Sequence, residues 1–248
     1  PMQRPRIYTP EVLRTGTTQD LPESAAAHVT RVLRLAAGDP ITLFDGTGTD
    51  YDAVLKVVAR SAVTVDVGAG RPAERESPLA VTLLQGVSRG ARMDTVVQKA
   101  TELGVRRLQP VLTGRSVVRL DAERAQARLE HWQRIVISAC EQCGRSVLPE
   151  VLPACPLDDA LATLEPGTVG LTLDPRGESG LDELLGATHR VALAIGPEGG
   201  FTADEIRTLT RAGFRGLRLG PRILRTETAP LAALAILQFA RGDLGPAS

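Results

Sequence analysis

The sequence predicts an α/β protein in which a small N-terminal β-barrel precedes a larger domain with a mostly parallel sheet. Residues 2–72 have the period-two or β-branched character of short strands, interrupted by one helix. A polar, proline-bearing stretch at 69–78 is typical of a linker. From residue 79 onward, apolar strands alternate with helical segments, as in a parallel sheet. We therefore expect one domain over 2–72 and a second over 73–248.

The N-terminal domain is expected to hold several strands and one helix. The clearest strands are 41–44, 51–58 and 62–67, and a glycine-containing turn lies at 45–48. Ser24 is the expected helix cap and Gly38 the expected helix end. The apolar side of this helix would consist of His28, Val29, Val32, Leu33 and Leu35. Small barrels of this kind often bind nucleic acid.

Three basic side chains gather on or near that helix. His28, Arg31 and Arg34 recur at three-residue spacing, which places them close together on a helical surface. Such a cluster is suited to phosphate contacts, and an ordinary solvated basic face explains it equally well.

The larger domain is predicted as a strand-helix alternation. Its expected strands are 79–84, 105–112, 168–173, 190–195 and 214–219. Asp94 and Asp121 are the expected caps of two helices, which end at Gly104 and at about Cys143. Thr202 opens a third helix, with Glu205 completing a capping box. An almost wholly apolar helix over 229–240 closes the domain.

Two loops follow strands of this domain and lead into helices, which is where open α/β sheets bind ligands. The first, 196–200, contains Gly196, Gly199 and Gly200, and the second, 220–228, begins at Gly220. Glycines let the backbone approach a flat ligand, and free N–H and C=O groups can read an adenine edge. Two ordinary tight turns are the alternative for either loop alone.

Composition limits the possible functions. The 29 basic residues balance the 29 acidic residues, so no overall field steers the protein to nucleic acid or to an anionic membrane. Only Lys56 and Lys99 are lysines, and the remaining arginines favour bidentate phosphate contacts. A GC-rich coding sequence explains that bias equally well. We find no signal pattern and no apolar run long enough for a membrane span, and expect a cytoplasmic protein.

The cysteines and the common catalytic motifs give no positive indication. Cys140 and Cys143 form a CxxC pair at the far end of a helix, whereas a redox pair needs a helix N-terminus. With Cys155 nearby, a zinc site would still lack a fourth ligand, so no metal is expected. The sequence contains no Walker, GxSxG or HExxH motif, which removes the common NTPase, hydrolase and zincin functions.

Longer motifs carry a family resemblance. The segments 196–200 (GPEGG) and 219–229 (LGPRILRTETA) resemble the cofactor-binding end of SPOUT methyltransferases, and closely that of the bacterial 16S ribosomal RNA uridine-N3 methyltransferases. The segments 88–104, 115–116 and 132–145 agree with the same family, and 28–39 resembles its PUA-like N-terminal domain. Gly114 departs from the pattern, where an acidic residue is expected.

The resemblance implies a C-terminal trefoil knot that grips S-adenosylmethionine, a homodimer, and a substrate that is 16S ribosomal RNA or the assembled 30S subunit. The implied cofactor-binding residues are Leu173, Ile195, Gly196, Pro197, Gly199, Gly200, Leu219, Gly220, Ile223, Leu224 and Thr228. Arg225 would stabilise the uracil anion, and Glu198 or Glu227 would accept its N3 proton. The implied RNA contacts are His28, Arg31, Arg34, Arg89, Arg92, Arg115, Arg145 and Arg222.

Two other functions stay open from the sequence. A SPOUT enzyme acting on a different RNA position would need the same pocket. A non-catalytic RNA-binding protein of the ribosome would share the basic residues but would not bind the cofactor.

Overall fold

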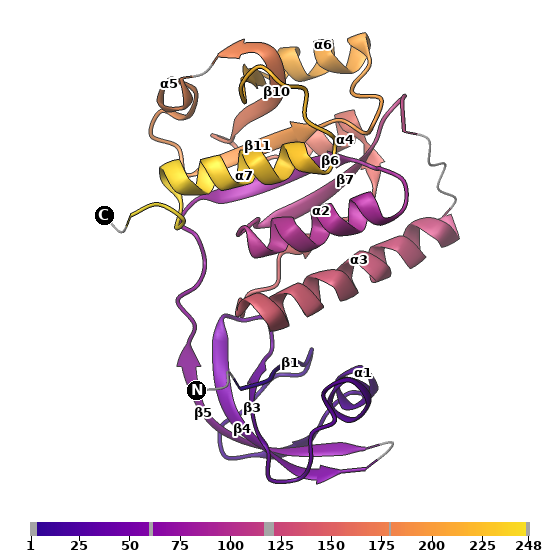
Figure 1. Ribbon diagram of the computed structural model, residues 1–248, viewed down its shortest axis with the longest axis vertical. Coiled ribbons are helices and arrows are strands. Elements are labelled where there is room, and N and C mark those ends of the chain that lie inside the picture. The colour runs from indigo at the N-terminus through magenta and orange to yellow at the C-terminus, as the bar shows by residue number, and fades with distance from the viewer. Residues whose placement is uncertain (1–3, 60–61, 117–121, 179, 247–248) are drawn as a thin grey trace. The chain divides into compact units, whose positions relative to one another are not determined.

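The computed structural model describes residues 4–59, 62–116, 122–178 and 180–246 (Figure 1). The chain divides into two compact units. Unit 1 comprises Pro1–Glu76 and Ile137–Leu148, and unit 2 comprises Ser77–Val136 and Pro149–Ser248. Unit 1 is therefore built from two stretches that are far apart in the sequence.

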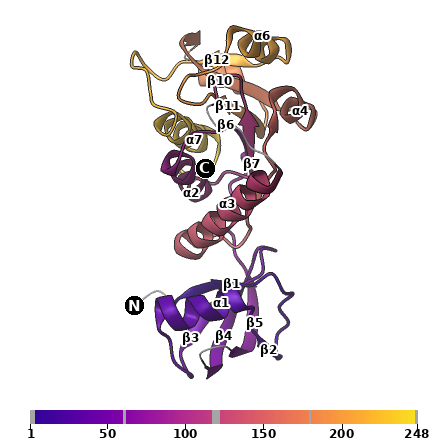
Figure 2. The ribbon, with the colours of Figure 1, turned by 90° about the vertical axis from the view of Figure 1, so that its right-hand side faces the viewer.

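Unit 1 contains a five-stranded mixed sheet (Figure 2). Its strands are β1 (Arg6–Tyr8), β2 (Thr18–Asp20), β3 (Pro40–Phe44), β4 (Thr49–Val58) and β5 (Val63–Pro72). The spatial order is β1-β3-β4-β5-β2, with β1 parallel to β3 and the other pairs antiparallel. In the described residues no ladder joins β1 to β2, so the hydrogen bonding is that of an open sheet rather than the expected barrel.

The helical segment of unit 1 differs from the expectation at both ends. Helix α1 (Glu23–Ala27) begins after Pro22, so Ser24 lies inside the helix and does not cap it. The chain continues as a π-helix, η1 (His28–Leu33), and stops at Arg34, which has a left-handed φ of 54°. This residue ends the segment before Gly38. Ala25, Ala26 and Val29 face the sheet core, whereas Val32 is 66% exposed.

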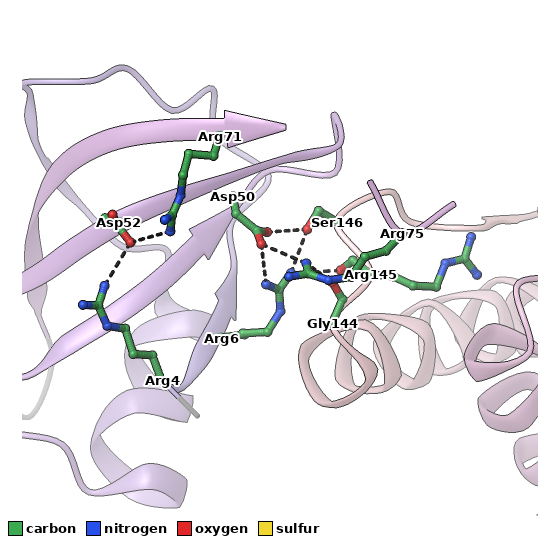
Figure 3. Close-up of polar contacts among 9 residues, drawn as sticks. All are labelled: Arg4, Arg6, Asp50, Asp52, Arg71, Arg75, Gly144, Arg145 and Ser146. Carbon is green, nitrogen blue, oxygen red and sulfur yellow. Dashed lines mark hydrogen bonds and ion pairs between the residues drawn. The ribbon is translucent and has the colours of Figure 1, made fainter. Parts of the chain in front are cut away.

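A buried ionic cluster joins the two stretches of unit 1 (Figure 3). Asp50 Oδ2 accepts hydrogen bonds of 2.9 Å from Arg6 and from Arg75, and its Oδ1 accepts one from the Ser146 hydroxyl. Arg6 also donates to the Arg145 carbonyl at 3.2 Å and to Ser146 Oγ at 2.7 Å. Three segments of unit 1 thus converge on one carboxylate.

The charge of Asp50 is strongly favoured in this cluster. Burial alone would raise its pKa, but the hydrogen bonds from Arg6, Ser146 and Arg75 outweigh burial and lower the pKa to about 2. The ionised carboxylate is therefore part of the native structure of unit 1 at neutral pH.

Unit 2 contains a second sheet in which every described pair of strands is parallel. Its strands are β6 (Ala80–Gly86), β7 (Arg107–Leu112), β8 (Glu150–Val151), β9 (Cys155–Pro156), β10 (Val169–Glu178), β11 (Arg190–Ile195) and β12 (Arg215–Leu217). The order is β12-β10-β11-β6-β7-β8, and β9 pairs with β7. The predicted parallel sheet is thereby confirmed.

Helices cover both faces of this sheet. They are α2 (Ala91–Glu102), α3 (Ala122–Cys143), α4 (Leu157–Ala162), α5 (Leu181–Leu185), α6 (Ala203–Arg211) and α7 (Thr228–Arg241). Figure 2 shows α2 and α7 on one face and α4 and α6 on the other. No helix in the described ranges is long and apolar enough to cross a membrane.

The ends of these helices test the predicted caps. The capping box of Thr202 and Glu205 is confirmed at the start of α6. Asp94 is not a cap, because α2 begins three residues earlier after Gly90, and its carboxylate instead contacts His131 Nε2 at 3.0 Å. The predicted cap Asp121 lies outside the described residues. Gly104 ends α2 as expected, with a positive φ of 77°.

We predict that Asp50→Asn destabilises the protein by about 3–5 kcal/mol, because it leaves the buried charge of Arg6 without its partner. Denaturant unfolding measures the change. The matched control is Asp52→Asn, whose side chain is 37% exposed and pairs with Arg4 and Arg71. The control should cost only about 0–1 kcal/mol. Equal losses in the two variants would contradict the role of the cluster.

The same carboxylate predicts a pH dependence. Because the folded pKa of Asp50 is about 2, against an ordinary value of 3.8, its stabilisation is complete above about pH 4. It is lost as the pH falls from there toward 2. The difference in unfolding free energy between wild type and Asp50→Asn should therefore narrow over that range, and a constant difference would contradict the assignment.

Candidate functional site

The two glycine-bearing loops of unit 2 meet at one cavity of about 590 Å³. The first loop contributes 196–200 and the second contributes 223–226. Eight of the predicted cofactor-binding residues line this cavity: Leu173, Ile195, Gly196, Pro197, Gly199, Gly200, Ile223 and Leu224. The two loops therefore line one cavity, as the sequence predicted.

A smaller cavity of about 110 Å³ adjoins the first. It contains the predicted residues Leu219 and Gly220, and it shares Leu173, Ile223 and Leu224 with the larger cavity. Thr228 lines neither cavity. It is the first residue of α7, and its N–H bonds to the Arg225 carbonyl.

Several lining residues were missed from the sequence. They are Thr172, Asp174, Arg176, Ala194, Phe201, Ile206, Thr226 and Ala229. Asp174 and Arg176 were not predicted as lining residues because β10 continues to Glu178, beyond the expected end at residue 173. The apolar run that defined the strand gave no signal for this polar extension.

Thr226 fastens the second loop to the first. Its hydroxyl donates to the Gly196 carbonyl at 2.8 Å and accepts from the Gln85 side chain at 3.2 Å. Ser88 Oγ lies 3.3 Å away. Thr226 is 8% exposed, and Gln85 is fully buried. The C-terminal loop is thus tied both to the 196–200 turn and to the end of β6.

The 196–200 turn is packed tightly against β6. Gly200 N–H bonds to the Pro197 carbonyl at 2.8 Å, which closes the turn. A Cβ on Gly86 would lie 2.5 Å from Pro197, so a side chain there would displace the turn. Arg115 donates to the Gly199 carbonyl at 2.8 Å and holds the outer side.

Gly114, the departure from the family pattern, has a structural partner here. Its N–H donates to Glu205 Oε1 at 2.8 Å, while the other carboxylate oxygen accepts the Thr202 N–H. A Cβ at position 114 would approach Thr202 Cγ2 to 3.2 Å. The backbone of Gly114, rather than an acidic side chain, is what contacts the start of α6.

Arg92 links the two candidate proton acceptors. Its Nη1 lies 2.9 Å from Glu198 Oε1, and its Nε lies 3.8 Å from Glu227 Oε2. Burial is the largest single influence and raises the pKa of Glu198, but hydrogen bonds from its own N–H, the Arg89 N–H and Arg92 together outweigh it and hold the pKa below the usual range. Glu198 lines the larger cavity, whereas Glu227 does not.

The predicted cationic residues fall into different environments. Arg225 lines the larger cavity and is exposed, and no carboxylate in the described part of the chain pairs with it. Arg89, Arg92, Arg115 and Arg222 are also exposed in unit 2. In unit 1, Arg31 and Arg34 are exposed and His28 is half-buried.

Arg145 was predicted to contact RNA, and its surroundings contradict that prediction. Its side chain is only 6% exposed, and both its Nε and its Nη2 donate to the Glu76 carboxylate. Both residues belong to unit 1. A buried and paired guanidinium stabilises the fold and is not a surface phosphate contact.

Of the three cysteines, Cys140 lies in the core, and Cys143 and Cys155 are partly buried. Cys140 is buried, and burial raises the pKa of its thiol to about 12. Burial also raises the pKa of Cys155. These thiols are poor nucleophiles, because the thiolate is the reactive form. Among the described residues, no three His, Cys, Asp or Glu side chains are placed to share a metal ion.

Comparison with known proteins agrees with this geometry. Residues 75–238 match the model of an RNA methyltransferase domain, and residues 21–68 match an RNA methyltransferase PUA domain. The ribosomal RNA small subunit methyltransferase E of Bacillus subtilis is 31% identical over 98% of this chain and 100% of its own length. The chain belongs to the ribosomal RNA small subunit methyltransferase E family. The resemblance predicted from the sequence motifs is thereby confirmed.

Another curated relative and two solved structures extend the match. The protein from Buchnera aphidicola (subsp. Schizaphis graminum) is 33% identical over 97% of this chain and 98% of its own length. The solved structure of the Neisseria gonorrhoeae enzyme, bound to S-adenosyl methionine, is 43% identical over 97% of this chain and 99% of that chain, with a TM-score of 0.93. The solved structure of the putative methyltransferase Lpg2936 from Legionella pneumophila, with bound SAM, is 38% identical. The match covers 98% of this chain and 100% of that chain, with a TM-score of 0.92.

The capping box beside the cavity predicts a stability effect. Thr202→Ala removes the hydroxyl that accepts the Glu205 N–H, and we expect a loss of about 0.5–2 kcal/mol in urea unfolding. The control is Thr210→Ala on the same helix, where the exposed hydroxyl bonds, among the described residues, only to the Ile206 carbonyl of that helix. It should change stability by no more than about 0.5 kcal/mol. A Thr202 effect no larger than the control would contradict the role of the cap.

Proposed function

We propose that this protein transfers a methyl group from S-adenosylmethionine to N3 of a uridine in 16S ribosomal RNA of the small subunit. The observation that carries the proposal is the single cavity lined by the 196–200 turn and the 223–226 segment. Family membership and the cofactor-bound relatives support the same activity. Because the substrate would be ribosomal RNA, we also propose a cytoplasmic location.

The cavity fits the cofactor in size and chemistry. Its volume of about 590 Å³ lies in the usual range for small-ligand pockets. Leu173, Ile195 and Leu224 offer apolar surface to an adenine ring, and the 196–200 backbone offers amides and carbonyls. The carboxylate of Asp174 lines both cavities and is suited to hydroxyl or ammonium donors.

Arg225 is the proposed source of transition-state stabilisation. S-adenosylmethionine supplies an electrophilic methyl carbon when bound, so the protein mainly aligns the reactants. The uracil N3–H is weakly acidic, and its anion needs nearby positive charge. Arg225 lines the cavity and has no carboxylate partner in the described residues, so its charge is available to the base.

Glu198 is the better placed of the two candidate proton acceptors, since it lines the cavity and Glu227 does not. Its pKa, however, is held below the usual range, which makes it a weak base. We therefore assign most of the rate acceleration to Arg225 and give Glu198, held by Arg92, the secondary role of accepting the proton.

Exposed arginines would hold the RNA. Arg89, Arg92, Arg115 and Arg222 form the proposed phosphate contacts of unit 2, and His28, Arg31 and Arg34 those of unit 1. The target base must leave any stack to reach the methyl group, as in other enzymes that act on bases.

We also propose the trefoil knot. The segment that joins β12 to α7 is tied by Thr226 to both the Gly196 carbonyl and Gln85 at the end of β6. These contacts support a C-terminal segment that is threaded beneath the first loop. The proposed domain boundary near residue 73 lies close to the division of the compact units between Glu76 and Ser77, but Ile137–Leu148, from the proposed second domain, belongs to unit 1.

The activity is tested by transfer of labelled methyl to 30S subunits and to naked 16S RNA, followed by mass mapping of the modified nucleoside. We expect 3-methyluridine at one position. A different methylated position would favour the other SPOUT activity. Calorimetry that shows no S-adenosylmethionine binding would overturn the enzyme assignment in favour of an RNA-binding protein.

We predict that Arg225→Ala lowers kcat by about 10²–10³-fold, because it removes charge stabilisation of the uracil anion. Arg225→Lys should retain part of the rate. The comparison variant Arg222→Ala, from the smaller cavity, should raise KM for RNA more than it lowers kcat. Steady-state kinetics and cofactor calorimetry measure these effects. A loss of cofactor affinity as large as the loss in kcat would assign Arg225 to cofactor binding instead.

We propose that the protein is a homodimer that uses α7. This helix and the residues after it expose three large apolar side chains: Ile236 (42%), Phe239 (64%) and Leu244 (49%). We expect Phe239→Glu to convert a dimer to a monomer in sedimentation velocity. Val12→Glu, at a 73% exposed position in unit 1, should leave the dimer intact. A wild-type monomer would refute this proposal.

A further inference from the structure

A separate cavity of about 280 Å³ lies wholly within unit 1. Its walls come from the chain at β1, the α1–η1 segment and the last turns of α3. The lining residues are Arg4, Pro5, Arg6, His28, Leu33, Ser138, Glu141 and Gln142. The volume lies just below the usual range of about 300–1,000 Å³ for drug-sized ligands, so it suits a single ring system.

Glu141 is the most informative polar group of this cavity. Its Oε1 accepts the Tyr8 N–H at 3.1 Å, and its Oε2 lies 3.8 Å from His28 Nε2. The side chain is 14% exposed. Burial raises the pKa of Glu141, although the Tyr8 N–H and the charges of His28 and Arg6 oppose this. Each carboxylate oxygen still has a lone pair for a further donor.

The two arginines at this cavity are paired with aspartates, and Arg6 Nε is buried without a hydrogen-bond partner among the described residues. Arg4 lies 2.9 Å from Asp52, and Arg6 lies 2.9 Å from Asp50. The half-buried Glu141 carboxylate lies beside arginines whose charges are already balanced by aspartates. This arrangement disfavours the binding of a phosphate and favours the binding of a ligand with N–H donors. Pro5 and Leu33 give the cavity apolar surface that could cover the faces of a ring.

We propose that this cavity binds an unstacked guanine base of the RNA, with Glu141 as the residue that reads it. The inference rests on the proposed function, because it takes RNA as the ligand. Guanine presents two adjacent donors, N1–H and the N2 amino group, which match the two oxygens of a carboxylate. Adenine and cytosine place an acceptor beside their amino group, and uracil flanks its N3–H with two carbonyls. Single-stranded RNA bases are commonly read at this edge.

The full-length protein is tested by fluorescence anisotropy with labelled oligouridylates that carry one central guanosine, inosine or adenosine. We expect guanosine to bind at least about tenfold tighter than adenosine, in line with the discrimination of a bidentate contact. Inosine, which lacks the N2 amino group, should lie between them. Equal binding of the three RNAs would overturn the proposal, and this result needs no variant.

Glu141→Gln provides the second test. A glutamine offers one acceptor and one donor, which matches adenine, so the variant should lose the guanosine preference and gain affinity for the adenosine RNA. Glu130→Gln is the matched control on the same helix, because Glu130 is exposed and contacts only Gln126 among the described residues. Glu130→Gln should bind the three RNAs with the same affinities as the wild type. A uniform loss for all three RNAs in Glu141→Gln would show a structural role and contradict the inference.

Failure of this inference is separable from failure of the proposed function. Glu141 lies in unit 1 and does not line the 590 Å³ cavity, so Glu141→Gln should keep the wild-type affinity for S-adenosylmethionine in calorimetry. If the protein binds the cofactor and transfers methyl groups but shows no preference for guanosine RNA, only the guanine-site proposal is overturned. Absence of cofactor binding in the wild type would remove the enzyme assignment.

Discussion

The hydrogen bond from Thr226 to the Gly196 carbonyl is the contact on which the larger cavity depends. It joins two loops that leave different strands, and the Thr226 side of this contact is buried. A buried hydrogen bond contributes only about 0.5–1.5 kcal/mol net, but leaving its partners unpaired costs more. The free-energy cost of breaking this hydrogen bond therefore keeps the two loops together. Gln85 contributes its amide N–H to Thr226, while its Oε1 has no hydrogen-bond partner among the described residues.

The protein uses ion pairs in two different ways. Asp50 and Arg6 are buried and multiply hydrogen bonded, with the more exposed Arg75 as a further donor, so they specify how two stretches of unit 1 meet. Around Arg92 the charges are largely exposed, so they contribute little to stability. Their effect is chemical, because Arg92 neutralises Glu198 and leaves Arg225 as the cation beside the cavity that has no carboxylate partner in the described residues.

Local patterns in the sequence predicted most of unit 2 because its strands and helices are apolar enough to have a clear period. The capping box at Thr202 and the positive φ of Gly104 were predictable from residue type alone. Thr226 and Asp174 were not, since their roles arise from tertiary contacts between distant segments. The same reason explains Arg145, whose burial depends on Glu76, and Glu141, whose neighbours lie in the first part of the chain.

The construction of unit 1 from two stretches has a consequence for how the chain folds during synthesis. Asp50 and Arg6 emerge early, but Ser146 and the end of α3 are made only after the first strands of the other unit. Domains usually fold in the order in which they leave the ribosome, whereas here the first unit cannot finish until the second has begun. The long chain separation of these contacts makes their formation slow. Until the end of α3 is made, Asp50 and Arg6 can pair with each other but lack the Ser146 hydroxyl and the Arg145 carbonyl that complete the cluster.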